Sequence, residues 1–563
     1  MEYYTFSYYI LTTIVLYILT THFVRKLLKC PPSPFVCLPI IGHLYVLKEP
    51  ITETFANLAN RYSPVLTLRF GSRLSLLVSS PTAAEECLSK NDVIFCNRPQ
   101  GFLAGKYLGY NYTSLNWAPY GPHWRNLRRI SAVEILSSHR LQNLASIRAD
   151  EVKRLIQRLC RCTGLYKNNK LTISLPKSVG PIHLHEDRKN NKNKFEISLT
   201  NNMSPENRHG DISSSNNSND LDEVVVMKPL LFNTTMNVMT RMIFGKRYYD
   251  DEEGDGEAER FREMVEGTFR LFNQVCIGDM VPYLRWLDWG KERKFKEFKE
   301  KREVLMRELI EEHKRETKRI NHVDNHEIKK PLIQVLLGLQ EDEPQYYTDD
   351  VILGTILDLL IGGSDTSAGT MEWAIALLLN NPKVLKKAQD EIDNNIGHER
   401  LIDERELARL PYLRSIITET LRMYPAAPLL VPRESSKQCV VLGYPIPKGT
   451  MLQVNLWAIQ NDPKLWDDPK SFRPERFEGV EGYKIGYKMM PFGSGRRSCP
   501  GEGLAVRVVG LAVGCLIQCF ELERFGDEFV DMGKAPGFNM HKAEPLKAKV
   551  RPREVMTKLL SEI

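Results

Sequence analysis

The sequence lacks the patterns that several classes of protein require. Its eleven cysteines are scattered singly, without a Cys-x-x-Cys pair, which argues against a secreted disulfide framework or a structural zinc site. No internal repeat occurs, and no long Lys/Arg run is interleaved with aromatic residues, so nucleic acid is not an expected partner. The net charge is only +7, from 77 basic and 70 acidic residues. What remains is a globular composition, 42% hydrophobic and 26% charged, over 563 residues.

The N-terminal segment departs from that composition. Residues 6–24 carry no formal charge, and at about 1.5 Å per residue they nearly match a bilayer's hydrocarbon core of roughly 30 Å. Arg25, Lys26 and Lys29 follow at once, so the positive-inside rule places the rest of the chain in the cytosol. We therefore predict an uncleaved, single-pass membrane anchor over residues 1–29. The alternative is a buried core helix at the N-terminus.

Two further segments organise the chain. Residues 30–50 are rich in proline, which disfavours a helix, so we predict a stiff hinge before a globular domain over residues 51–563. Residues 166–220 contain the runs KNNK and SSSNNSND and no sustained apolar period. Such a segment cannot bury enough surface to offset the entropy lost on ordering. We predict that it is a disordered surface insertion.

Periodicity indicates a mainly helical fold with small β-sheets. Residues 67–79 alternate as two short strands around Gly71, further short strands are expected within 438–453, and helical periodicity dominates from Trp124 onward. Residues 349–379 are predicted to form one long apolar helix that contains the sequence GGSDTS. Paired glycines are unfavourable in a helix by about 1 kcal/mol each relative to alanine, so close approach to a flat cofactor is one compensating reason.

The sequence PFGSGRRSCPG, at residues 491–501, carries the strongest chemical signal. Its glycines permit a tight turn with positive φ, whose N–H groups would face a thiolate at Cys499. Arg496, Arg497 and the N-terminus of the apolar helix after Gly501 would favour the ionised sulfur. This arrangement suits an axial metal ligand. The alternative is a buried structural cysteine beside a glycine-rich turn.

The spacing of Phe492, Gly495, Arg497, Cys499 and Gly501 resembles the haem-binding signature of the cytochrome P-450 superfamily. Three more motifs of that family occur in the right order, and the resemblance covers the chain except the predicted insertion. It implies a helical core around haem b, with Cys499 as the proximal thiolate ligand that favours O–O cleavage. By the same resemblance Arg497 pairs a haem propionate, and the Phe492 ring packs beside the sulfur.

A second motif supplies a charged network. Glu419 and Arg422 stand at i and i+3 on one helix face, and alone they are a commonplace surface pair. Within this family they resemble the ExxR motif, completed by Arg476. A buried network of this kind costs desolvation, so its expected role is to fix the architecture of the haem pocket.

The remaining motifs are assigned to the cofactor and to proton transfer. Trp124 and Arg128, one turn apart, resemble the donors that hold haem propionates, and Arg433 matches another propionate-binding position. Asp365 and Thr366 resemble the family's oxygen-activation motif, in which the threonine hydroxyl bonds dioxygen and the acid delivers protons. The alternative is that Thr366 bonds back to its own helix and only bends it.

Substrate contacts are the least specific part of the prediction. The expected walls of the pocket are residues 100–112, 268–276, 362–363, 427–431 and 538–540, which together favour a lipophilic substrate. Asp-Thr-Ser, Pro-Glu-Arg-Phe and the closing Lys-Ala-Glu-Pro-Leu resemble plant microsomal members, the isoflavone-hydroxylase-like group above all.

The resemblance implies a function and a cellular setting. The expected enzyme is a monooxygenase of the endoplasmic reticulum membrane with a cytosolic catalytic domain. It would hydroxylate a small lipophilic plant secondary metabolite with O2 and electrons from a separate NADPH–cytochrome P-450 reductase. Two alternatives remain: an oxygen-independent haem-thiolate enzyme of rearrangement or dehydration, and a non-catalytic haem- or ligand-binding protein.

Overall fold

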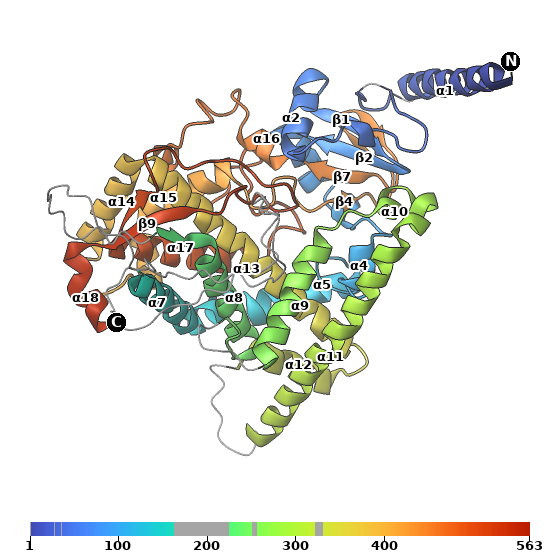
Figure 1. The fold of residues 1–563 in the computed structure, drawn as a ribbon. Coiled ribbons are helices and arrows are strands. Elements are labelled where there is room, and N and C mark those ends of the chain that lie inside the picture. Colours follow the sequence, from blue (N-terminus) through green and yellow to red (C-terminus); the bar gives the residue numbers. More distant parts are fainter. Residues whose placement is uncertain (1, 28, 35, 163–223, 250–255, 321–329) are drawn as a thin grey trace, which may run out of the picture.

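The computed structural model describes residues 2–27, 29–34, 36–162, 224–249, 256–320 and 330–563. The predicted insertion at 166–220 lies outside the described residues. The chain is mainly helical (Figure 1). The helices are α1 Glu2–Leu27, α2 Ile51–Arg61, α3 Pro81–Glu85, α4 Leu103–Tyr107, α5 Pro122–Ile130, α6 Ser138–Asn143, α7 Ala145–Cys162, α8 Met227–Phe244, α9 Gly256–Phe272, α10 Ile277–Met280, α11 Trp289–Ile320, α12 Leu332–Asp342, α13 Asp349–Asn380, α14 Pro382–Asn395, α15 Pro411–Met423, α16 Leu456–Gln460, α17 Glu502–Cys519 and α18 Thr557–Glu562.

The strands form small sheets, as the sequence predicts. They are β1 Val65–Phe70, β2 Arg73–Val78, β3 Val224–Val226, β4 Arg433–Glu434, β5 Cys439–Val441, β6 Tyr444–Ile446, β7 Met451–Val454, β8 Phe520–Arg524 and β9 Lys547–Pro552. One sheet has the order β1-β2-β7-β4, with β2 and β7 parallel; the others are β3-β9-β8 and the hairpin β5-β6. Gly71, at φ +60°, supplies the left-handed turn between β1 and β2. This confirms the predicted pair of strands.

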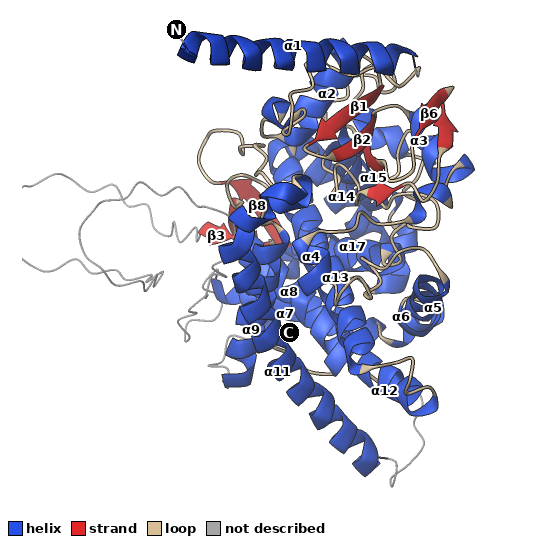
Figure 2. Ribbon diagram, turned by 90° about the vertical axis from the view of Figure 1, so that its right-hand side faces the viewer, coloured by secondary structure: helices blue, strands red, loops and turns tan. Residues whose placement is uncertain are grey.

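The helical core is built around α13 and α17 (Figure 2). Helix α13 packs against α8, α15 and α17, and its middle is apolar on nearly every side because neighbours surround it. At Gly363 a side chain would meet the Met239 sulfur of α8 at 2.5 Å, so this glycine sets how closely the two helices approach. The predicted long helix is therefore present and continuous, and it forms one wall of the site described below.

The segment predicted as a membrane anchor is the helix α1, which projects at the edge of the body in Figure 1. Most of its described side chains, among them Tyr4, Phe6 and Leu19, are exposed. Among the described residues, the helices long and apolar enough to cross a membrane are α13 and α17, and most of their apolar stretches are buried inside the protein. These two are core helices of the protein body.

Candidate active site

A cavity of about 340 Å³ opens between α13 and the loop that leads into α17. All eleven cysteines lie within the described residues, and Cys499 is the one that lines this cavity. The side chains around it combine an apolar majority with several cations. The predicted residues that line it are Trp124, Arg128, Thr366, Arg433, Phe492, Arg497 and Cys499. Asp365, Glu419, Arg422 and Arg476 do not line it.

The loop before α17 presents the Cys499 sulfur to the cavity. Gly493 and Gly495 both have φ +74°, and a side chain at Gly495 would lie 2.3 Å from a carboxylate oxygen of Asp92. The Cys499 amide donates to the Phe492 carbonyl at 2.8 Å, which closes the turn. Glycine is thus required here both by backbone conformation and by space.

The electrostatics of Cys499 differ in part from the prediction. Burial raises the pKa of the thiol, while N–H groups at the start of α17 and the Arg128 guanidinium act in the opposite direction. Arg496 pairs instead with Asp92 at 3.1 Å, and Arg497 donates to backbone carbonyls, including that of Cys96 at 2.8 Å. The cation that acts on the sulfur is therefore Arg128. A bound metal cation would itself favour the thiolate.

Four guanidinium groups gather beside the cavity: Arg98, Arg128, Arg433 and Arg497. Burial lowers the pKa of each, to about 10 for Arg497, and repulsion from the neighbouring arginines lowers that of Arg98 further. Within the described residues, the Asp92 carboxylate lies 3.4 Å from the Arg433 guanidinium. Asp358 is the other acid that interacts electrostatically with these arginines, through Arg98.

This cluster carries more positive charge than its neighbours neutralise. Buried charges are costly unless they are paired, so the cluster requires an anionic partner in the cavity. A flat cofactor that carries two carboxylates meets that requirement. The residues present therefore fit haem b, with its propionates toward the arginines and its axial ligand from the cysteine. Arg98 was not predicted, because a single arginine in Asn-Arg-Pro gives no local signal.

Two aromatic residues of the prediction line the same space with defined contacts. The Trp124 indole N–H donates to the Leu115 carbonyl at 3.1 Å, and the Arg497 guanidinium lies 4.4 Å from the Trp124 ring. Trp124 thus supports an arginine of the cluster, and its own donor is already engaged. Phe492 lies on the loop and packs edge-on against Tyr483, at 6.3 Å between ring centroids. Their predicted contacts with haem and with the sulfur stay predictions.

The predicted charged network is assembled away from the cavity. Arg422 donates to both carboxylate oxygens of Glu419, at 2.6 and 2.9 Å, and both side chains are fully buried. Arg476 donates to Glu419 at 3.2 Å, as does the Arg473 backbone amide at 3.1 Å. The network therefore ties α15 to the segment Pro474–Phe477, and it holds the chain that precedes the cysteine loop.

Asp365 and Thr366 stand side by side on α13, and their partners differ. The Thr366 hydroxyl donates to the Gly362 carbonyl at 2.8 Å, within its own helix. Asp365 accepts from the His541 ring at 2.9 Å and from the Asn539 amide at 2.8 Å. Burial would raise the pKa of Asp365, but His541 and Asn539 outweigh it and hold the pKa below its ordinary value.

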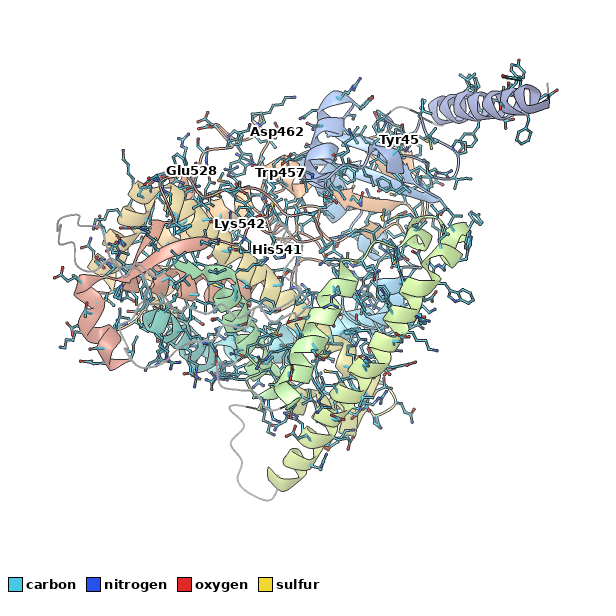
Figure 3. The ribbon with its side chains drawn as sticks, viewed as in Figure 1. Tyr45, Trp457, Asp462, Glu528, His541 and Lys542 are labelled. Carbon is cyan, nitrogen blue, oxygen red and sulfur yellow. The ribbon has the colours of Figure 1, made fainter. Side chains whose placement is uncertain are left out.

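His541 was not predicted as a functional residue. It lies between β8 and β9, far from α13 in sequence, and Figure 3 labels it near the centre of the molecule. Its ring fits there because position 369 is glycine, where a side chain would lie 3.2 Å from the ring nitrogen Nδ1. The carboxylate of Asp365 is thus ionised and oriented by a residue from a distant segment.

Each predicted wall contributes to the cavity. The lining includes Leu108, Phe269, Phe272, Asn273, Gly362, Gly363, Ala427, Leu430, Val431, Phe538 and Asn539. Met239 on α8, Arg302 on α11 and Asp358 on α13 also line it and were not predicted. These three residues lie on long helices, and helical periodicity in the sequence does not indicate which of their residues face a cavity.

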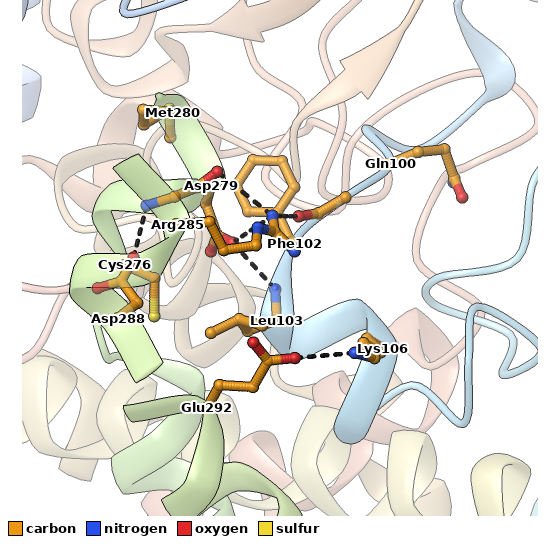
Figure 4. Close-up of polar contacts among 12 residues, drawn as sticks. Gln100, Phe102, Leu103, Lys106, Cys276, Asp279, Met280, Arg285, Asp288 and Glu292 are labelled. Carbon is orange, nitrogen blue, oxygen red and sulfur yellow. Dashed lines mark hydrogen bonds and ion pairs between the residues drawn. The ribbon is translucent and has the colours of Figure 1, made fainter. Parts of the chain in front are cut away.

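Polar contacts tie the segment that carries α4 to α10 and α11 beside this cavity (Figure 4). The Asp279 carboxylate accepts from the Leu103 amide at 3.0 Å, and Lys106 pairs with Glu292 at 2.8 Å. Arg285 also donates to the backbone of the same segment. Burial raises the pKa of Asp279 to about 6 even though the Leu103 amide and nearby arginines lower it.

Comparison with known proteins identifies the class to which this site belongs. The chain belongs to the cytochrome P450 family, whose model matches residues 31–173 and 207–547. It is 42% identical to cytochrome P450 81Q32 of Catharanthus roseus over 96% of this chain and 94% of that protein. It is 39% identical to isoflavone 2'-hydroxylase of Medicago truncatula, over 95% and 94% respectively. These relatives fit a plant member of the isoflavone-hydroxylase-like group.

A solved structure has the same fold. The zebra fish cytochrome P450 with progesterone superimposes with a TM-score of 0.69 at 24% identity, over 90% of this chain and 100% of that one. Membership of the family makes the protein an oxidoreductase of the monooxygenase class, with haem b held through a cysteine thiolate. It also implies a redox partner and a small-molecule substrate.

Proposed function

We propose that this protein hydroxylates a small lipophilic plant secondary metabolite, with electrons from a separate NADPH-dependent reductase. The observation that carries the proposal is the cavity itself. One end has Cys499 and a surplus of buried and half-buried arginine, and the α13 wall carries Thr366, which precedes Ser367 and follows an ionised Asp365. Several relatives are named as hydroxylases of isoflavones, which are compounds of this class.

Each group of residues has one task in this proposal. When bound, haem b supplies the activation of dioxygen and the transfer of one oxygen atom. Cys499 would be the axial ligand, and Arg98, Arg128, Arg433 and Arg497 would hold the propionates. The apolar walls exclude water and position the substrate.

Proton delivery would fall to the acid and alcohol of α13. For that role the Thr366 hydroxyl must turn from the Gly362 carbonyl toward the cavity, where it can pass on a proton received from Asp365. His541 and Asn539 hold the pKa of Asp365 below its ordinary value, so a proton that the carboxylate accepts from solvent is bound weakly and is readily passed on. The same Thr366–Gly362 bond is the observation that favours the oxygen-independent alternative, in which no relay is needed.

We also propose the cellular setting and the division of the chain. Residues 1–29 would anchor the protein in the endoplasmic reticulum membrane, residues 30–50 would form the hinge, and residues 51–563 would form a cytosolic catalytic domain. Support comes from the uncharged stretch of α1 and from the basic residues that follow it. Loss of membrane association on removal of residues 1–29, tested by fractionation, is the expected result.

Turnover in labelled oxygen tests the proposed reaction. The purified protein is combined with a plant NADPH–haemoprotein reductase, an isoflavone and 18O2. We expect a hydroxylated product that carries one labelled oxygen atom and is absent without NADPH. Asp365→Asn should lower this yield. Conversion of a peroxide without oxygen or NADPH, at a rate unchanged in Asp365→Asn, would instead support the alternative.

A further inference from the structure

One end of the cavity contains a buried charge that the fold leaves incompletely paired. The Arg302 side chain extends from α11, is 1% exposed and lines the same cavity as Cys499. Its Nη2 group donates to the Tyr107 carbonyl at 2.9 Å. Its Nε and Nη1 groups are buried and have no hydrogen-bond partner among the residues that the structure describes.

The surroundings of Arg302 stabilise the charge without using these donors. The guanidinium lies 4.8 Å from the Tyr110 ring centroid and 5.9 Å from that of Phe298, which are cation–π distances. The Tyr110 hydroxyl is close to the guanidinium but lacks hydrogen-bond geometry and is itself unpaired. Within the described part of the chain, no carboxylate lies at ion-pair distance from Arg302. Asp358 interacts electrostatically with Arg302, and its carboxylate already accepts from the Asn116 amide at 2.6 Å.

A buried guanidinium whose N–H groups have no acceptor raises the free energy of the folded protein. A buried donor without an acceptor destabilises the folded protein, and the penalty is larger when the group is charged. A fold that keeps this charge against the wall of a cavity, where a hydrophobic residue of similar size would fit, must satisfy it with something that enters the cavity. The required partner is a hydrogen-bond acceptor, because guanidinium has only donors.

The distance along α13 indicates how large that partner is. Asp358, Gly362 and Thr366 follow one another at intervals of four residues and all line the cavity, so they share one face of the helix. Eight residues at about 1.5 Å each separate the Asp358 end from Thr366 by roughly 12 Å. A molecule of two or three linked rings spans that length.

We propose that Arg302 forms a substrate subsite whose Nε and Nη1 groups bind an acceptor oxygen, carbonyl or phenolate, of an oxygenated aromatic substrate. The bound carbonyl or phenolate oxygen would lie beside α11, and the ring system would extend from there along the cavity wall that α13 forms. This inference rests on the proposed function and adds to it the substrate class and the residue that recognises it.

A matched pair of ligands tests the subsite. Equilibrium dialysis with the haem-containing protein compares an isoflavone with the corresponding isoflavan, which lacks the ring carbonyl. A hydrogen bond to a charged group contributes about 1.5–3 kcal/mol, so the wild type should bind the isoflavone about 10- to 100-fold more tightly. In Arg302→Leu this ratio should fall to nearly one, mainly through weaker binding of the isoflavone. Arg293→Leu, on the exposed face of α11, should keep the wild-type ratio.

Two further measurements keep the result decisive. If Arg302→Leu does not fold, Arg302→Gln keeps a neutral donor and should give an intermediate ratio. A purely structural role for Arg302 would lower the melting temperature of the variant and leave the ratio unchanged, which would overturn the proposal. A wild type that binds both ligands equally, or neither, would also overturn it. Dialysis requires no turnover, so failure of the proposed hydroxylation would appear separately, as binding discrimination without product.

Discussion

Glu419→Gln is a direct test of what holds the cysteine loop in place. Glu419 accepts two bonds from Arg422, one from Arg476 and one from the Arg473 amide, and its own side chain is fully buried. The amide keeps the shape of the carboxylate but removes its charge, and it replaces one acceptor with a donor that faces a guanidinium. Arg422 is fully buried, so its charge would be left uncompensated.

Loss of one partner from a buried ion pair costs about 3–5 kcal/mol. The matched control is Glu297→Gln, the same chemical change in an exposed pair with Arg293 at 3.4 Å, where about 0–1 kcal/mol is expected. Denaturant unfolding, followed by far-ultraviolet circular dichroism and by haem absorbance, measures both variants. A loss below 1 kcal/mol in Glu419→Gln, equal to that of the control, would refute the view that the network is stabilised by mutual compensation of buried charges.

Three further predictions concern the loop, the relay and the polar contacts beside the cavity. Gly495→Ala should abolish haem retention, because its side chain would meet Asp92 and backbone at 2.3–2.5 Å; Gly493→Ala, with no atom nearer than 3.8 Å, should cost only about 1–2 kcal/mol of strain. Asp365→Asn should lower turnover by about 100-fold or more while the reduced carbon-monoxide spectrum is unchanged. Burial raises the pKa of Asp279 from 3.8 to about 6, so its contribution to stability is full below pH 4 and lost as pH rises through 6. The unfolding free energy of Asp279→Asn, relative to wild type, should therefore rise by about 3 kcal/mol between pH 4 and 7; a constant difference would contradict the buried-acid account.

The sequence predicted those parts of the site that depend on backbone conformation or on residue spacing within one segment. The glycine-rich turn, the Glu419–Arg422 spacing and the long apolar helix each follow from backbone conformation or helical period, and the structure contains all three. Arg476 was assigned to the network because its motif is recognisable in the sequence. The strands on either side of Gly71 followed from alternation.

The partners of individual side chains were beyond the reach of sequence. His541 meets Asp365 across 176 positions, and Arg302 reaches the cavity from the middle of a charged helix. Neither has a neighbour in sequence that marks it. Arg496 lies in the cysteine loop but forms an ion pair with Asp92, because a carboxylate is a stronger partner for a guanidinium than a thiol is. Tertiary contacts decide such choices, and residue spacing does not encode them.

The most direct test of the account is the reduced, carbon-monoxide-bound difference spectrum of the protein, recorded beside Cys499→Ala. Cys499 is the one cysteine at the cavity, so the wild type should give the strongly red-shifted Soret band of thiolate-ligated haem. The variant should lose that band, even if some haem stays bound. A red-shifted band that persists in Cys499→Ala, or haem binding without the shift in the wild type, would contradict the assignment of Cys499 as the axial ligand.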